Sequence, residues 1–248
     1  MVEIIVRSPD TVLDSPVLVE GLPGVGLVGK IATDHIIEQR DMTYYADVTG
    51  EELPPVAVFD ERDSDVKPPI RLFADKDNDL LALRSDVPVS AINAPAFAED
   101  VTEWLDDEGV LPLYLSGLPT SREPDAIPSI FGVSTGDGSR HLDETDVESP
   151  STAGMISGPA GALLSRARRR NLSAVGFVVE TDPRFPDPQG ARILIEQGIN
   201  PVIGPEIDTA PLVEQAEEIM EQREQLAQQM REAAEHESSQ ASEISMYQ

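Results

Sequence analysis

The chain contains no cysteine, so disulfide bonds, a thiolate nucleophile and cysteine-ligated metals are all excluded. It also lacks long apolar runs, and no stretch approaches the ~20 apolar residues that cross a bilayer. The strand-like segment Val2–Val6 follows Met1 directly, and we therefore expect no signal peptide. These absences predict a cytoplasmic protein with no membrane partner.

Basic residues are scarce, at 18 against 46 acidic residues, which gives a formal net charge of −28. Only three of them are lysines, namely Lys30, Lys67 and Lys76. The acidic residues are spread along the whole chain, and this pattern keeps a protein hydrated and dispersed in concentrated salt, where self-repulsion is screened. We therefore expect a halophilic protein from a salt-accumulating archaeon. The same charge argues against nucleic acids and anionic membranes as partners.

Apolar segments without alternation dominate the first 200 residues, and a hydrophobic content of 40% is sufficient for a buried core. Strands are predicted at residues 2–6, 17–20, 44–48, 56–60, 70–73, 80–83, 113–115, 130–133 and 174–179, and helices at 30–39, 96–107, 158–170 and 189–197. Such strands interleaved with helices are typical of an α/β body with a mostly parallel sheet. The pair 70–73 and 80–83 indicates one antiparallel hairpin. Residues 134–152 are polar and acidic, and we expect them to form an exposed loop.

The character of the chain changes at Pro211. Apolar residues then alternate at spacings near three and four, the coiled-coil period, at Leu212, Ala216, Ile219, Leu226, Met230 and Ala233. We therefore divide the chain into an α/β body (1–207), a C-terminal helix that could form a coiled coil (208–236) and a flexible polar tail (237–248).

A glycine-rich turn joins the strand at 17–20 to the following helix, and it contains Gly21, Pro23, Gly24, Gly26 and Gly29. Its G-x-G-x-x-G spacing matches the dinucleotide-binding fingerprint, and Asp47 stands where a ribose-binding acid could follow. A nucleotide-binding enzyme is therefore the alternative function. Pro23 argues against it, because proline removes one amide donor from the turn. Glycines that permit a tight turn and close packing are the favoured interpretation.

Residues suited to catalysis are few. His35 lies in a predicted helix and is interpreted as structural, and His141 precedes an acidic cluster (Asp143, Glu144 and Asp146) that is interpreted as a solvated surface. We therefore predict no catalytic residue, no metal and no cofactor. The basic cluster at 166–170 either complements the negative end of a helix or contacts an acidic partner or another subunit.

Five blocks of sequence resemble the archaeal proteasome assembly chaperone family, which comprises homologues of the second eukaryotic assembly chaperone. These blocks are Glu20–Gly29, Ser116–Thr120, Gly158–Leu164, Val178–Thr181 and Phe185–Ala191. The resemblance implies a three-layer α/β fold like that of nucleoside phosphorylases, without their active site. It also implies self-assembly or pairing with a family member, and binding to 20S proteasome α subunits.

The resemblance also gives a role to the last three residues, Met246, Tyr247 and Gln248. Proteins that bind the proteasome carry a terminal hydrophobic-Tyr-any motif, and capture of a terminal carboxylate is a known recognition mode. By analogy, the Gln248 carboxylate would pair with a lysine between adjacent α subunits, while Tyr247 and Met246 would pack against the pocket wall. The family's ATP-grasp label, by contrast, requires lysines to hold nucleotide, and three scattered lysines give it little support.

Overall fold

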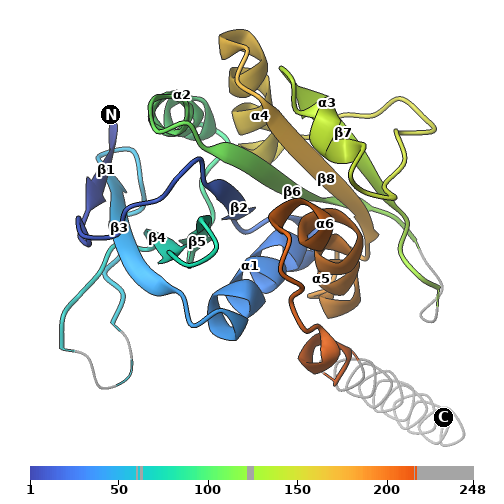
Figure 1. Ribbon diagram of the computed structural model, residues 1–248, viewed down its shortest axis with the longest axis horizontal. Coiled ribbons are helices and arrows are strands. Elements are labelled where there is room, and N and C mark those ends of the chain that lie inside the picture. Colours follow the sequence, from blue (N-terminus) through green and yellow to red (C-terminus); the bar gives the residue numbers. More distant parts are fainter. Residues whose placement is uncertain (60, 62–63, 122–125, 215, 217–248) are drawn as a thin grey trace, which may run out of the picture.

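The computed structural model describes residues 1–59, 61, 64–121, 126–214 and 216, and Figure 1 shows their arrangement. They form an eight-stranded sheet in the order β1-β3-β4-β5-β2-β6-β8-β7. The strands are β1 (Val2–Val6), β2 (Val17–Gly21), β3 (Thr43–Gly50), β4 (Ile70–Asp75), β5 (Leu80–Ser85), β6 (Leu111–Pro119), β7 (Ile130–Thr135) and β8 (Ala174–Thr181). The helices are α1 (Val28–Gln39), α2 (Ala94–Asp107), α3 (Ser139–Leu142), α4 (Gly158–Arg170), α5 (Pro188–Ile193) and α6 (Asn200–Ile203), with a 3₁₀ turn η1 (Val25–Leu27) and a π-helical turn η2 (Leu194–Ile199).

The sheet is mixed. Its centre is parallel, because β2 runs parallel to both β5 and β6, and β6 runs parallel to β8. The strands on either side are antiparallel: β1, β3 and β4 extend from β5, and β7 closes the other edge beside β8. The expected parallel arrangement therefore holds for four adjacent strands, β5, β2, β6 and β8, within a mixed sheet. The turn between β4 and β5 is short, and a short turn can join only antiparallel neighbours, which explains this pair.

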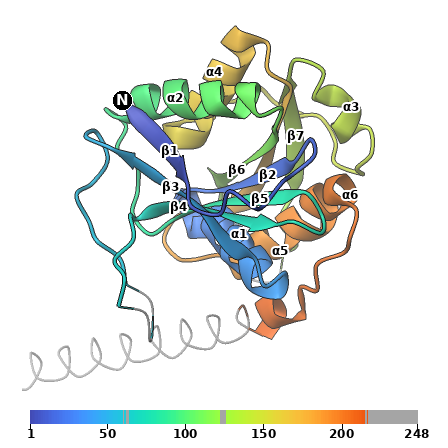
Figure 2. The same ribbon diagram turned by 60° about the vertical axis from the view of Figure 1, so that its left-hand side comes forward.

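Helices cover both faces of the sheet, which gives three layers. Figures 1 and 2 show α2 and α4 on one face and α1, α5 and α6 on the other. Adjacent side chains of β2 enter different cores: Leu18 packs on the α2/α4 side, and Val19 packs on the α1/α5 side. Because both faces are buried, the central strands show continuous apolar runs rather than alternation.

Two local predictions are corrected by the structure. Residues 56–59 form no strand, and the described part of this segment contributes only an isolated bridge between Val58 and Lys67. Pro54 and Pro55 explain the difference, because proline lacks the amide that a strand ladder requires. The polar segment 134–152 is a loop for most of its length but also contains α3 and the end of β7.

The C-terminal segment begins on the body of the protein. Residues 210–214 are helical, with Pro211 in the first turn as expected, and Leu212 is buried in the α1/α5 core. Most of the predicted helix (208–236) and all of the predicted tail (237–248) lie outside the described residues. Within the described residues, no helix combines the length and apolarity needed to span a membrane.

Candidate functional site

The glycine-rich turn packs tightly against the carboxyl ends of neighbouring strands. Gly26 adopts φ +65°, a left-handed conformation that favours glycine. A Cβ atom at Gly26 would collide with the side-chain oxygen of Thr181, at the end of β8. The Gly26 carbonyl accepts a hydrogen bond of 2.9 Å from the Asp187 amide. Close packing against Thr181 therefore explains the glycine at position 26.

The surroundings of the turn do not match a dinucleotide site. Asp47 lies on β3, and two strands, β5 and β4, separate β3 from β2 in the sheet. Its Oδ2 atom accepts a hydrogen bond of 2.7 Å from Arg7 Nε, so this carboxylate is already paired. Of the other predicted turn residues, Gly21 ends β2, Pro23 and Gly24 line a groove described below, and Gly29 packs beside Leu115.

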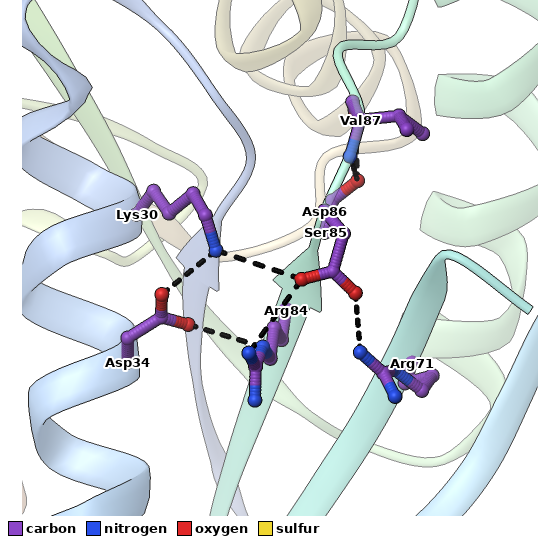
Figure 3. Close-up of polar contacts among 7 residues, drawn as sticks. All are labelled: Lys30, Asp34, Arg71, Arg84, Ser85, Asp86 and Val87. Atoms are coloured by element: carbon purple, nitrogen blue, oxygen red, sulfur yellow. Dashed lines mark hydrogen bonds and ion pairs between the residues drawn. The ribbon is translucent and has the colours of Figure 1, made fainter. Parts of the chain in front are cut away.

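Lys30, the residue after the turn, belongs to a network of five charged side chains that joins α1 to β4 and β5 (Figure 3). Its Nζ atom lies 2.7 Å from Asp34 and 3.8 Å from Asp86. Arg84 contacts the same two carboxylates at 3.3 and 3.5 Å, and the buried Arg71 also pairs with Asp86. Lys30 therefore forms ion pairs within the fold, and its ammonium group is not positioned to bind a phosphate above the turn.

Glu20 is a charged side chain in the middle of the sheet, with 1% of its surface exposed. The register between β2 and β6 ends at the pair Val19 and Leu113, where the two strands begin to diverge. Beyond that point the Glu20 carboxylate accepts hydrogen bonds from the amides of Leu22 (2.7 Å) and Leu115 (3.2 Å). Where β2 and β6 separate, the Glu20 carboxylate thus accepts hydrogen bonds from backbone amides that no longer pair between the two strands.

Burial raises the pKa of Glu20 to about 7, although the two amide donors act in the opposite direction. Tyr114, the neighbour of Glu20 on β6, is also buried. Desolvation is the main cause that raises the pKa of the Tyr114 phenol, and the nearby charge of Glu20 is the second. Perturbed acids at the carboxyl end of a parallel sheet are common in functional sites. Glu20 is therefore a candidate site residue that the sequence analysis did not single out.

Glu20 lines a groove of about 970 Å³ on the α2/α4 face of the sheet. The floor comes from β6, β7 and β8, and the walls come from residues 150–157 and from α4. Phe131 and Val133 of β7 are only half buried. The groove therefore combines apolar side chains with hydroxyl groups, Glu20, Glu180 and Arg168, a mixture that can bind ligands or protein segments.

The basic cluster at 166–170 divides into two pairs. Arg166 pairs with Glu99 of α2, and Arg170 lies 3.4 Å from Glu103, also of α2. Arg168 and Arg169 are exposed and form no ion pair with any residue that the structure describes, and Arg168 lines the groove. Half of this cluster therefore stabilises helix packing, and the other half remains available to an acidic partner.

Two histidines lie within the described residues, and one is buried while the other is half buried. His35 is buried, with Nε2 2.6 Å from the carbonyl oxygen of Asp208. His141 is half buried, with Nδ1 3.7 Å from Glu144. Across the described ranges, no group of three or more histidine, aspartate or glutamate side chains is placed to hold a metal ion. The predicted tail motif, Met246, Tyr247 and Gln248, lies beyond the described residues.

Comparison with known proteins identifies relatives over most of the chain. Residues 18–227 match the protein family described as "PAC2 family". The uncharacterized protein MJ0106 of Methanocaldococcus jannaschii is 26% identical over 212 residues, which cover 83% of each chain. These matches confirm the resemblance to the archaeal proteasome assembly chaperone family that the five sequence blocks indicated.

Solved structures share the fold. Pyrococcus furiosus PbaA, an archaeal homolog of proteasome-assembly chaperone, superposes with a TM-score of 0.78 at 24% identity, covering 100% of this chain and 99% of that one. Pyrococcus furiosus PbaB, an archaeal proteasome activator, gives a TM-score of 0.73 at 21% identity, with 91% of this chain and 98% of that one covered.

Proposed function

Because the chain belongs to the PAC2 family, we propose that it is a non-catalytic proteasome assembly chaperone or regulator that binds the α-ring of the 20S proteasome. The family match over residues 18–227 carries this proposal. The chain shares its fold with a homolog of a proteasome-assembly chaperone and with a proteasome activator, and this likeness favours the proteasome as the partner. The likeness to nucleoside phosphorylases is part of the same proposal and concerns the fold alone.

We assign proteasome binding to the C-terminal residues. The Gln248 carboxylate would pair with a lysine between two α subunits, and Tyr247 and Met246 would fill the rest of the pocket. One such tail binds weakly, because a short segment pays for its ordering on binding. Several tails on one homo-oligomer would bind more tightly through effective concentration. The C-terminal helix (208–236) would hold the protomers together or set the tails at a useful distance.

The geometry of the glycine-rich turn gives no support to the alternative, a nucleotide-binding enzyme. Thr181 occupies the space beside Gly26, and Lys30 is paired with Asp34 and Asp86. Asp47 lies on β3, which two strands separate from β2, the strand that leads into the turn. No histidine lines the groove beside Glu20, so the serine–histidine pairing of many hydrolases is not among its described lining residues. We therefore propose that the body acts by binding and not by catalysis.

Co-purification with native 20S proteasome tests the proposal. Deletion of residues 246–248 and addition of one glycine after Gln248 should both abolish retention on the proteasome, because each removes the carboxylate from its position. Gln248→Ala is the matched control, since it keeps a terminal carboxylate and should be retained like the wild type. Full retention of the extended chain would refute docking by the tail, and failure of the wild type to bind would refute the proposed partner.

A further inference from the structure

A strap, residues 204–209, leads from α6 to the helical residues 210–214 (Figures 1 and 2). Gly204 begins the strap with φ +87°, a conformation that favours glycine, and its amide donates to the carbonyl oxygen of Asn200 at 3.1 Å. Among the described residues, no backbone–backbone hydrogen bond joins residues 205–208 to another part of the chain. The backbone groups of the strap must therefore find their partners on side chains or in water.

Helix α1 holds the strap through His35 and through Arg40, which directly follows the last residue of the helix. Arg40 donates a hydrogen bond of 2.6 Å from Nη2 to the carbonyl oxygen of Pro205. His35 Nε2 lies 2.6 Å from the carbonyl oxygen of Asp208, and since a carbonyl oxygen only accepts, Nε2 carries the proton. Both bonds join a side chain to a backbone carbonyl, so the hold of α1 on the strap depends on the identity of these two side chains.

Helix α6 and the π-helical turn η2 hold the strap from the other side. Asn200 accepts a hydrogen bond of 3.1 Å from the Ile207 amide, and Glu196 accepts one of 2.5 Å from the Thr209 hydroxyl. Ile207 is 3% exposed, and Leu212, just beyond the strap, is 1% exposed, and both belong to the α1/α5 core. Apolar side chains therefore anchor the strap, and polar contacts on two sides define its path.

The two kinds of contact have different consequences for the path of the chain. Burial of apolar side chains is non-directional, so Ile207 and Leu212 alone would hold the strap on the body without fixing its course. Hydrogen bonds require defined distances and angles, and they select one course. We propose that His35, Arg40 and Asn200 are positioning residues, which fix the place and the direction in which the C-terminal residues leave the body.

This inference rests on the proposed function for its purpose, because it gives the docking tail a fixed starting point on the body. Effective concentration falls as the flexible chain between two binding sites becomes longer. Freeing residues 204–209 adds six residues to the 12 of the predicted tail, which lowers the effective concentration at least about twofold for each tail after the first. A fixed strap therefore helps several tails to engage one proteasome ring.

Hydrogen–deuterium exchange of the full chain in molar KCl tests the positioning residues directly, because amide exchange reports rare local opening. The amides of Ile207, Leu212 and Val213 are hydrogen-bonded and serve as reporters of the strap and of the helical residues after it. His35→Phe and Arg40→Ala should each accelerate exchange of these amides by roughly 10-fold, as expected when one hydrogen bond is lost.

Two controls separate local release of the strap from a general loss of stability. The amides of β8 are the internal reference, since a destabilised body would exchange faster there as well. Gln39→Ala is the matched variant, because Gln39 is the exposed neighbour of Arg40, and the reporter amides should then exchange at the wild-type rate. Wild-type exchange of the reporters in both test variants, or equal acceleration in the strap and in β8, would overturn the proposal.

Binding to native 20S proteasome separates this inference from the proposed function. The double variant Ile207→Asp/Leu212→Asp places a charge at both apolar anchors and so detaches the strap, but it keeps residues 246–248. Its affinity should fall at least about twofold for each tail after the first, whereas deletion of residues 246–248 should abolish binding. Wild-type affinity of the detached chain would contradict the positioning role. Failure of the wild type to bind would refute the proposed function alone, and the exchange rates would still decide on the strap.

Discussion

Replacement of Glu20 by glutamine should remove a large pH-dependent component from the stability of the protein. The pKa of this carboxyl rises from 4.5 to about 7 on folding, chiefly because of burial. The folded protein therefore binds a proton that the unfolded chain releases between these two values, and stability falls as pH rises through this window. The shift corresponds to about 3 kcal/mol over the full range, at 1.36 kcal/mol per unit.

The measurement is the free energy of unfolding of both proteins in denaturant, at constant molar KCl, between pH 5.5 and 8.5. This range avoids the isoelectric region near pH 4.2 and contains about 2 kcal/mol of the full effect. The stability advantage of the wild type over Glu20→Gln should shrink by that amount as pH rises. At the acidic end the variant should be the less stable protein, since one amide donor faces the new NH₂ group.

A matched control is Glu3→Gln, which changes an exposed glutamate on β1. The difference between this variant and the wild type should stay constant across the same pH range. A Glu20→Gln curve that also runs parallel to that of the wild type would refute the reasoning, because it would show that the carboxyl is not desolvated at the divergence of β2 and β6.

Two further substitutions test the packing of the body by thermal and denaturant unfolding. Gly26→Ala should destabilise the protein by roughly 1–3 kcal/mol more than Gly109→Ala. Both glycines have a positive φ, but only a Cβ at Gly26 would meet Thr181. Equal losses of stability would show that this collision is relieved without cost. Leu212→Ala should cost about 2–5 kcal/mol, because Leu212 is 1% exposed in the α1/α5 core, and a loss below about 1 kcal/mol would show that the start of the C-terminal segment does not stabilise the body.

The sequence predicted the central elements well because their signals are local. Continuous apolar runs such as Ala174–Val179 have a physical cause, burial on both faces, and the structure places this run in β8, an interior strand between β6 and β7. The glycine-rich turn was also predicted, with close packing as its favoured interpretation. The strand prediction at 56–60 was wrong for its described residues, 56–59, because their apolar side chains resemble a strand, whereas Val58 forms an isolated bridge to Lys67 and Phe59 is exposed.

The groove could not be predicted because its parts are far apart in the sequence. Its floor combines strands from residues 115–119, 129–135 and 178–180, and its wall comes from 150–168. Glu20 left one local signal, a single charged residue at the end of an apolar strand and before a glycine-rich turn. Its burial, however, depends on Leu115, which is 95 residues away and supplies an amide only when β6 lies beside β2.

The affinity of the purified chain for native 20S proteasome, with and without one glycine added after Gln248, tests the central claim most directly. If the free carboxylate docks between α subunits, the extended chain should bind at least about tenfold more weakly, since its charge no longer reaches the lysine. Equal affinities of the two chains would contradict the account.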